Sequence, residues 1–385
     1  MTTLRIIDTE FNLIDEITLY QSLQITNKYH DVGILEMKIN RYMRGANELE
    51  IDRIIFTENN TSKAFVIVHR EIELDENGTE TENWQIKALS LKYWLAKRII
   101  LPPPHTANQN KSGHAETVMK HYVNITTVNP TDTKRKIPKL VIAPDLGRGD
   151  TISRSARFDT LSEEIATIST LTGVGWNISV DITNKQFVFD VVIGANKTAT
   201  QTALPPIIFS PEWGTIESLE YTESKLDYKN MAYVAGQGEG IERRVITLND
   251  NTAGHDIYEL YVDARDVSET DDESEGSPRP TSAILEDLTE RGNEKLAECE
   301  QTIYFGGQIL TSNNFIYERD WSNGDIVTLQ HEGWGITTDA RITEVKEIHQ
   351  SGSPFEIEVV FDNDKPTLID KIKREFKSLN PIKKT

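Results

Sequence analysis

Apolar and polar residues alternate with a period of two over much of the chain, in short runs that end at turn residues, and this pattern predicts β-strands. Strands at such regular spacing predict a small barrel or sandwich. Two of the runs are joined by Asp75-Glu76-Asn77-Gly78, in which Asn-Gly is typical of a hairpin turn. The strands expected in this N-terminal part are Leu4–Ile7, Leu13–Ile17, Leu23–Ile25, Glu36–Ile39, Phe65–Leu74 and Trp84–Leu89.

Helical spacing replaces the alternation after these strands. Ser90–Lys97 is expected to be helical, and Pro102, Pro103 and Pro104 end that element at a domain boundary. A second helix is predicted over His114–Val123, where apolar residues fall at i, i+3, i+4 and i+7. The residues expected to be buried are Leu91, Trp94 and Leu95 in the first helix and Ala115, Val118, Met119 and Tyr122 in the second.

A third helix and a hairpin complete an α+β segment. Thr160 to Glu163 fits a capping box, which opens a helix that ends at Gly173. Two alternating arms then flank Asn184-Lys185, as in a hairpin. We expect this segment to be inserted in a β framework and to fold semi-independently. Its apolar positions are Leu161, Ile165, Ile168 and Leu171 on the helix, Trp176, Ile178, Val180 and Ile182 on one arm, and Phe187, Phe189, Val191 and Ile193 on the other.

The segment Leu219–Leu248 reads as the end of one strand system and the start of another. Met231–Ala235 is an apolar strand, residues 236–240 carry glycine at every second position, and Ile241–Leu248 is expected to resume as a strand. Glycines after a strand can cradle a phosphate, but that chemistry uses the N-terminus of a following helix. Because strand alternation follows here, a backbone bend or bulge is the preferred interpretation.

The C-terminal third returns to strands after one long helix. Asp266–Pro280 is read as a solvated acidic loop, because its carboxylates lack the order of a calcium loop. Thr281–Glu300 is expected to be a helix with Leu285, Leu288, Leu296 and Cys299 on its apolar face. Strands are expected at Ile257–Val262, Thr302–Phe305, Phe315–Glu318, Ile326–Gln330, Arg341–Ile348 and Phe355–Phe361. A basic helix with Ile369, Ile372, Phe376 and Leu379 on one face is expected at the end.

Composition and charge limit the classes of function that the chain can have. The 385 residues predict two to four domains, and 37% hydrophobic residues suffice for folded cores. A formal charge of −20 argues against a surface that grips nucleic acid, which needs clustered Lys and Arg. The sequence has no apolar segment that marks export or membrane insertion.

Residues with catalytic or metal-binding potential are few. Cys299 is the one cysteine and is expected in a core, which excludes an internal disulfide and a Cys-rich metal site. His114 and His121 lack the spacing of a zinc protease, and Arg148-Gly149-Asp150 is read as a loop tripeptide. The sequence also has no G-x-S-x-G motif. We therefore predict no catalytic, cofactor-binding or metal-binding residues, no cofactor and no enzyme activity.

Four stretches resemble a known family. They are SLKYWLAKRII, GHAETVMKHYV, IPKLVIAPDLGRGDTISRSARFDTLSEEIATISTLTGVGW and LDYKNMAYVAGQGEGIERRV. They resemble the Gp37-like tail proteins of long-tailed phages, which are similar to the baseplate hub proteins that form the N-terminal part of tail-associated lysins and tail-tip proteins. The resemblance covers roughly residues 1–365, and the segments 112–197 and 226–245 are the specific ones.

The resemblance implies a β-rich α+β fold with two barrel-like hub domains. The implied domains are 1–102 with 203–235 for the first barrel, 103–202 for the inserted α+β domain, 236–256 with 301–365 for the second barrel, 257–300 for a strand, acidic loop and helix insertion, and 366–385 for the basic helix.

It also implies a structural role at the virion tail tip. The expected assembly is a homotrimer that closes the tail tube, beside a distal tail protein ring, the tape measure protein and a downstream tail fibre or receptor-binding protein, while DNA passes through. The alternative is a glycan-binding or glycan-degrading β protein. It is motivated by abundant carboxylates and by Trp213, Trp321 and Trp334, which the sequence suggests are exposed.

Overall fold

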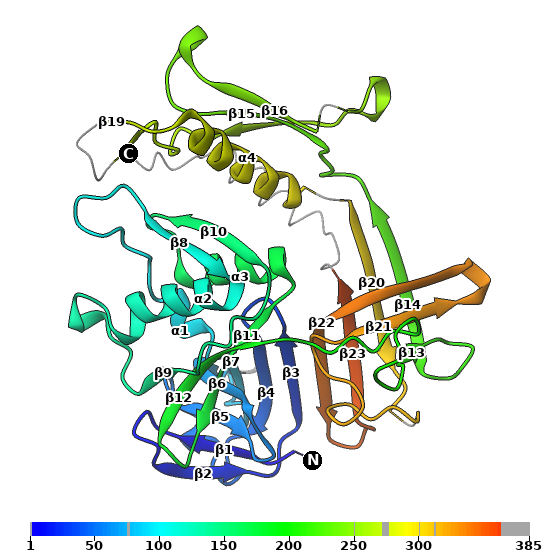
Figure 1. The fold of residues 1–385 in the computed structure, drawn as a ribbon. Helices are drawn as coiled ribbons and strands as arrows, with labels where there is room; N and C mark the ends of the chain where they lie inside the picture. Colours follow the sequence, from blue (N-terminus) through cyan, green and yellow to red (C-terminus); the bar gives the residue numbers. More distant parts are fainter. Residues whose placement is uncertain are drawn as a thin grey trace. The chain divides into compact units, whose positions relative to one another are not determined.

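Strands and hairpins dominate the computed structural model of the chain (Figure 1), which confirms the β-rich α+β expectation. The structure describes residues 2–74, 78–249, 251–271, 277–299, 301–311 and 313–362. Three predicted features lie outside the described residues: the turn at 75–77, the centre of the acidic loop at 272–276, and the C-terminal helix at 366–385.

One 13-stranded sheet contains the first and last parts of the described chain. Its strands are β1 (Leu4–Ile7), β2 (Leu13–Ile17), β3 (Ser22–Lys28), β4 (Ile34–Asn40), β5 (Ile54–Thr57), β6 (Asn60–Glu71), β7 (Asn83–Ser90), β13 (Ile208–Phe209), β14 (Ile216–Ser224), β20 (Thr302–Ile309), β21 (Ile326–His331), β22 (Ile336–Gln350) and β23 (Glu356–Asp362). Their order is β14-β20-β23-β22-β3-β4-β7-β6-β5-β1-β2, with β21 beside β22 and β13 beside β21.

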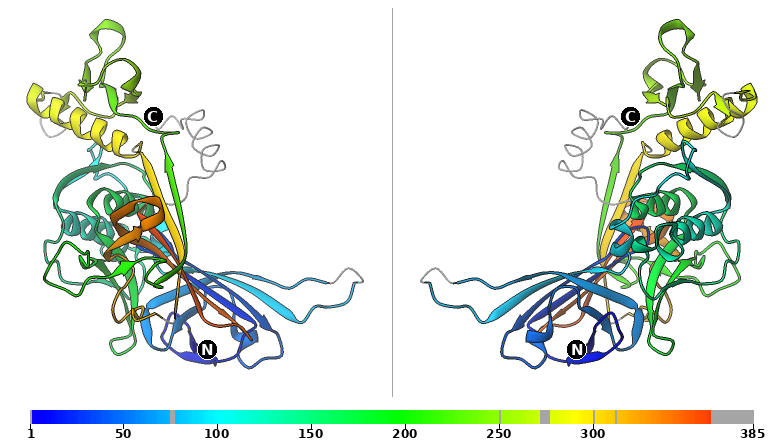
Figure 2. Two further views of the ribbon diagram at one scale, coloured as in Figure 1. Left: turned by 90° about the vertical axis from the view of Figure 1, so that its right-hand side faces the viewer. Right: turned by 90° about the vertical axis from the view of Figure 1, so that its left-hand side faces the viewer.

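This order brings distant segments together. The antiparallel pair β22–β3 joins the C-terminal strands to the N-terminal ones, with Glu344 opposite Lys28. The predicted hairpin of β6 and β7 is confirmed, and it extends beyond the neighbouring strands (Figure 2). Among the described residues no sheet closes on itself, so the main path of the large sheet ends at the edge strands β2 and β14, and its side branch ends at the two-residue strand β13.

The predicted α+β segment forms beside the N-terminal strands. Its strands pair as β10-β8 and as β11-β12-β9, with β12 parallel to β9. The short helix α1 (Tyr93–Ala96) precedes the segment, whose elements are β8 (Gln109–His114), α2 (Ala115–Val123), the π-helix η2 (Asn124–Val128), the 3₁₀ turn η3 (Thr133–Arg135), β9 (Leu140–Ile142), β10 (Thr151–Ala156), α3 (Leu161–Thr172), β11 (Gly175–Asp181) and β12 (Gln186–Val192).

The apolar face predicted for α2 is fully buried, as are Leu91 and Leu95, and Trp94 is nearly so. These residues share one core with Ile54 and Phe56 of β5. The inserted segment is therefore packed on the N-terminal strands through a continuous core.

The chain divides into two compact units. The first contains residues 2–103, 108–219 and 306–362, and the second is built mainly from 220–305. The border after Leu219 falls at the start of the predicted seam, inside β14. The proposed domain boundaries stay a prediction.

In the second unit a helix covers a three-stranded sheet. The strands β15 (Met231–Ala235), β16 (Val245–Leu248) and β17 (Glu259–Asp263) lie in the order β16-β15-β17, and α4 (Thr281–Ala297) packs on them. At Gly292 a Cβ atom would come within 2.4 Å of Leu248 and 2.5 Å of Val234, so glycine lets the helix approach the sheet. The short elements are η4 (Gly240–Glu242), η5 (Gly254–Asp256), β18 (Thr270–Asp271) and β19 (Ser277–Pro278), and η1 (Ala46–Glu48) and η6 (Glu332–Trp334) belong to the first unit.

Two element predictions are wrong. Phe315–Glu318 is a turn rather than a strand, because the Asp320 carboxylate accepts the Ile316 N–H and Asn313 accepts the Phe315 N–H. The expected strand Ile241–Leu248 begins only at Val245, since residues 240–242 form a 3₁₀ turn.

Three details of the helices also differ. The buried row of α4 runs through Ile284, Leu288, Gly292 and Leu296, whereas Leu285 is 37% exposed and Cys299 is half-buried beyond the helix end. Leu171 at the end of α3 is exposed. Thr160 is the N-cap residue of α3 but makes no side-chain capping hydrogen bond, so the capping box does not form.

Candidate functional site

The two histidines singled out in the sequence have different contacts. His114 Nδ1 lies 3.0 Å from the Gly149 carbonyl oxygen, and His121 lies against Gln109 and Tyr122. Cys299 belongs to the second unit. Among the described residues no group of three or more His, Cys, Asp or Glu side chains could hold a metal ion, and no helix has the length and apolar character needed to span a membrane.

An arginine closes the glycine-rich bend at residues 236–240. Arg243 donates to the carbonyl oxygens of Gly236 (2.7 Å) and Ala235 (2.8 Å), to Tyr261 Oη (2.7 Å), and to Asp263. The bend thus presents carbonyl oxygens to a bound guanidinium, which is the opposite of a cradle of N–H groups for phosphate. Ile241 at its tip is fully exposed.

The tryptophans of the glycan alternative separate into two kinds. Trp321 is 1% exposed and packs against Phe209 and Tyr317, so its expected exposure is wrong. Trp213 and Trp334 are 55% and 48% exposed.

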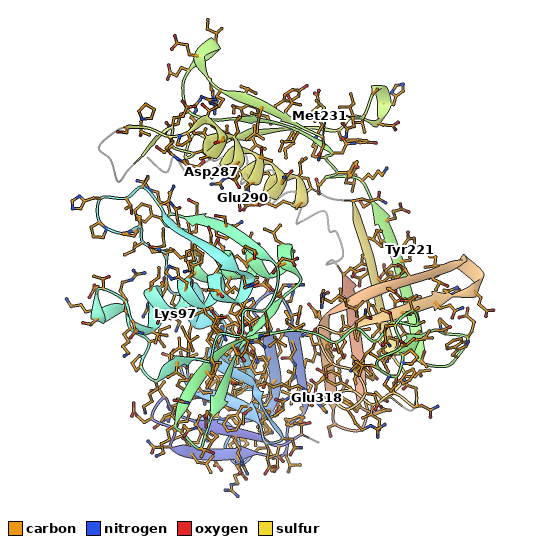
Figure 3. The ribbon with its side chains drawn as sticks, viewed as in Figure 1. Lys97, Tyr221, Met231, Asp287, Glu290 and Glu318 are labelled. Atoms are coloured by element: carbon orange, nitrogen blue, oxygen red, sulfur yellow. The ribbon has the colours of Figure 1, made fainter. Side chains whose placement is uncertain are left out.

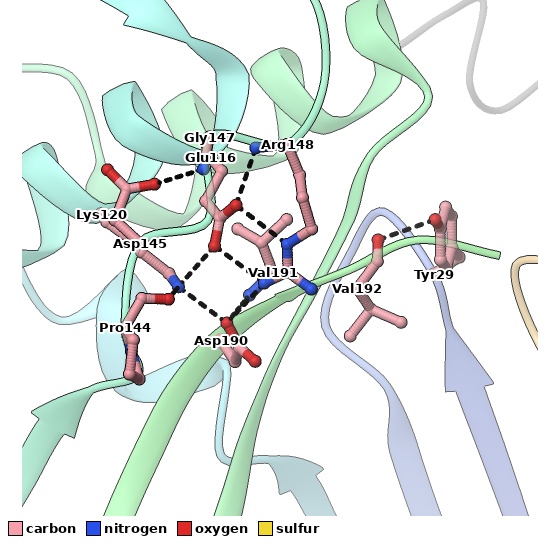
Figure 4. Close-up of polar contacts among 10 residues, drawn as sticks. All are labelled: Tyr29, Glu116, Lys120, Pro144, Asp145, Gly147, Arg148, Asp190, Val191 and Val192. Carbon is pink, nitrogen blue, oxygen red and sulfur yellow. Dashed lines mark hydrogen bonds and ion pairs between the residues drawn. The ribbon is translucent and has the colours of Figure 1, made fainter.

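Tyr29, directly after β3, lies at a junction of three segments of the first unit. Its hydroxyl donates to the carbonyl of Val192, the last residue of β12 (2.9 Å; Figure 4), and accepts the Gly194 N–H just after that strand (3.1 Å). The Arg341 guanidinium of β22 lies 5.4 Å from the ring centre. One tyrosine therefore ties the N-terminal strands to the inserted segment and to the C-terminal strands.

Glycines make this approach possible. A Cβ at Gly175 would lie 2.3 Å from the Tyr29 ring, and one at Gly324 would lie 2.2 Å from it. His30, the next residue, is half-buried beside Ser169, and its partial burial, with Arg341 and Lys92 nearby, lowers its pKa to about 4. His30 is thus neutral near pH 7.

Lys92 stabilises the same junction through hydrogen bonds to the backbone. Its Nζ donates to the carbonyl oxygens of Lys28 (2.8 Å), Tyr29 (3.3 Å) and Asp31 (3.0 Å) and lies 4.7 Å from the Trp176 ring centre. Burial lowers the pKa of Lys92 to about 7. Three carbonyl dipoles hold the amine where the chain leaves β3.

Lys92→Met should remove a pH dependence of stability. The folded pKa of Lys92 is near 7 and the unfolded pKa is near 10.5, so the unfolded chain binds more protons between these values. The free energy of unfolding of the unmodified chain should therefore rise relative to Lys92→Met as pH increases through this window, by at most about 1.4 kcal/mol per pH unit. Urea unfolding of both proteins at several pH values in this window measures the difference. If the free energies of unfolding of the two proteins change in parallel with pH, the lowered pKa of Lys92 is contradicted.

A buried ion network fixes the inserted segment (Figure 4). Glu116 on α2 is 0% exposed, and its carboxylate accepts from Lys120 Nζ (2.6 Å) and from Arg148 Nε (2.9 Å), Nη2 (2.8 Å) and the backbone N–H (2.8 Å). Asp190 on β12 accepts from Lys120 and Arg148 as well. Arg148, read from the sequence as part of a loop tripeptide, is a structural residue here.

A second buried ion pair joins strands far apart in the sequence. Lys63 of β6 contacts Glu347 of β22, and its Nζ lies 2.7 Å from Glu318 (Figure 3) and 4.9 Å from the Tyr317 ring centre. Burial raises the pKa of Glu347, although Lys63 opposes the shift. The pair reinforces the β22–β3 side of the large sheet.

The edge strands β2 and β14 carry or adjoin exposed apolar residues. The edge strand β14 has nine residues, and Tyr221 on it (Figure 3) is 36% exposed and packs 4.9 Å from Phe305 between ring centres. At the other edge Leu13 and Leu19 are exposed. Edge strands carry backbone groups that another chain can pair with.

Comparison with known proteins assigns the family. A family model described as Siphovirus ReqiPepy6 Gp37-like protein matches residues 3–361. The chain belongs to this family. The resemblance inferred from the sequence is thereby confirmed, and no curated protein matches the sequence.

Solved structures similar to this Gp37-like chain include three tail proteins. The prophage tail protein gp18 from Listeria monocytogenes is 14% identical with a TM-score of 0.53, and the match covers 98% of this chain and 99% of that one. The 43 kDa tail protein of prophage MuSo2 from Shewanella oneidensis is 9% identical with a TM-score of 0.55, over 93% and 98%. A Neisseria meningitidis tail protein is 11% identical with a TM-score of 0.54, over 94% and 97%. At these identities the likeness concerns the fold.

Proposed function

We propose that the chain is a structural baseplate hub protein at the tail tip of a long-tailed phage or prophage, where three copies form a ring that closes the tail tube. The observation that carries this proposal is the family match over residues 3–361, together with the likeness in fold to whole tail proteins. The neighbours we propose are a distal tail protein ring, the tape measure protein and a downstream tail fibre or receptor-binding protein.

The two sheet edges support a ring. β14 and β2 lie at opposite ends of the same sheet and differ in sequence and length. Contact between unlike surfaces of successive copies is heterologous, and such contacts close into a ring when the rotation fits. We propose that neighbouring copies complete two barrel-like lobes, one around β1–β7 and one around β20–β23, with the domain boundaries expected from the sequence.

A structural role also agrees with the chemistry of the chain. The polar groups with the densest contacts, around Tyr29, Glu116 and Lys63, are satisfied by protein partners and hold segments together. We propose that the chain is not an enzyme. The charge of −20 would let DNA pass through the ring without adhering to it.

The mass of the purified chain tests the ring. Light scattering at high protein concentration should give three times the chain mass of 43.7 kDa, and with the distal tail protein it should give the mass of a complex that contains three copies of the chain. The trimer should persist when salt is added, because backbone pairing and apolar contacts are screened by salt less than surface ion pairs are. A protein that stays at one chain mass under all these conditions would refute the trimer.

A further inference from the structure

Two turns of the first unit present tryptophans to solvent in the same way. Residues 210–214 follow β13 and residues 331–335 follow β21, and each turn places a half-exposed tryptophan directly before a glycine with positive φ, Gly214 (62°) and Gly335 (65°). Because β13 and β21 are parallel neighbours, the two turns leave the sheet at the same end.

A carboxylate joins the turns. Glu212 Oε2 accepts the Ser210 hydroxyl (2.6 Å), and Oε1 accepts the backbone N–H of Glu332 (3.1 Å) in the other turn. These bonds lower the pKa of Glu212, the Ser210 hydroxyl most, so the group stays ionised near pH 7. Its Oε1 atom also lies 3.7 Å from His331 Nδ1.

The Trp334 ring is held flat against His331. The ring centres are 4.0 Å apart and the planes differ by 7°, while His331 Nδ1 accepts the backbone N–H of Trp334 at 3.2 Å. One ring face is therefore occupied by the imidazole, and the indole remains 48% exposed. A fixed, exposed tryptophan loses little conformational entropy when a ligand covers it.

We propose that these two turns form a saccharide-binding platform. A pyranose ring has a face of C–H groups, which suits the electron-rich face of an indole, and a rim of hydroxyl donors, which suits a fixed carboxylate acceptor. Small-ligand sites combine apolar surface with a few fixed polar groups. Here two exposed indoles supply the apolar surface, and one oriented carboxylate supplies the polar group.

The negative charge of the two turns determines which class of sugar can bind. Glu212 and Glu332 are exposed in the two turns, and among the described residues neither carboxylate forms an ion pair with a Lys or Arg side chain. An anionic sugar would be repelled by this surface, so the platform takes neutral pyranosides, including N-acetylated amino sugars. Saccharide binding of this kind does not depend on ring assembly.

Calorimetric titration of the full chain tests the platform. The probes are tri-N-acetylglucosamine and cellotriose, with tri-galacturonate as the anionic comparison. At least one neutral probe should bind more tightly than tri-galacturonate. Trp213→Ala and Trp334→Ala should each weaken that binding by about tenfold, the loss expected for a buried aromatic anchor. Tyr42→Ala removes another exposed aromatic residue, 73% exposed on the same unit, and should leave binding unchanged.

Each alternative outcome is decisive. Absence of binding by both neutral probes, equal binding of tri-galacturonate, or equal loss in Tyr42→Ala would overturn the saccharide platform. If the tryptophan variants instead lose affinity for the distal tail protein while no probe binds, the turns are a protein interface. Unchanged thermal unfolding of both tryptophan variants, together with an unchanged light-scattering mass, would separate failure of this site from failure of the hub role.

Discussion

Replacing Glu116 by alanine should lower the free energy of unfolding by about 3–5 kcal/mol, because it removes the buried one of the two carboxylates that pair with Lys120 and Arg148 and leaves both cations only Asp190. Glu116 is fully buried and Lys120 is 5% exposed, so neither ammonium nor guanidinium can recover full hydration in place. The loss should appear in urea unfolding as a lower midpoint of the transition that includes the inserted segment.

The matched control is Glu163→Ala, which removes an exposed glutamate from the first turn of α3. Its cost should stay within about 0.5–1 kcal/mol, as expected for a surface charge near a helix N-terminus. Equal effects of the two substitutions would show that the buried network does not stabilise the fold.

The pH dependence of the same group has a definite sign. Burial alone would raise the pKa of Glu116, but hydrogen bonds from Arg148 and Lys120 lower it below the ordinary value of 4.5. Stability from a lowered carboxyl pKa is present above the unfolded value and is lost as pH falls. Below about pH 4.5 the unmodified chain should therefore lose stability faster than Glu116→Ala.

Gly194→Ala should be the most damaging small substitution at the Tyr29 junction. An added Cβ would lie 1.7 Å from the Gly324 carbonyl oxygen and 2.7 Å from the Asp325 nitrogen, and both are backbone atoms that cannot rotate away. The neighbouring bonds, Ala195 N–H to Asp325 Oδ1 (2.7 Å) and Ile326 N–H to the Ala195 carbonyl (2.9 Å), would have to lengthen.

We expect a loss of at least about 3 kcal/mol, since overpacking and broken buried hydrogen bonds add together. Thermal unfolding should show a midpoint lower by several degrees or more. Gly352→Ala is the control: no atom lies within 4 Å of its added Cβ, and only the φ of 82° is unfavourable. A smaller effect at Gly194 than at Gly352 would contradict the close contact.

Local patterns predicted most of the elements, because period and turn chemistry act over a few residues. The α2 face and the β11–β12 hairpin follow directly from spacing. The Phe315–Glu318 strand failed because side chains of Asn313 and Asp320 bind the backbone there.

The junction residues carried no local signal. Lys63 and Glu347 are separated by 284 positions, and nothing near Lys63 in the sequence predicts its burial. The exposed positions of Trp213 and Trp334 agree with the expectation from sequence, whereas Trp321 is covered by Phe209, which lies more than a hundred residues away. The need for glycine at Gly175 and Gly324 becomes apparent only from the structure, because the Tyr29 ring lies where a Cβ atom would be. Contacts between distant segments, rather than any motif, define this site.

Cryo-electron microscopy of the chain bound to its distal tail protein ring tests the hub most directly. The proposed function predicts three copies in a closed ring with threefold symmetry around an open or plugged channel, with β14 of one copy beside a different sheet edge of the next. A single bound copy, a ring of another number, or three copies joined without contact at either sheet edge would contradict it.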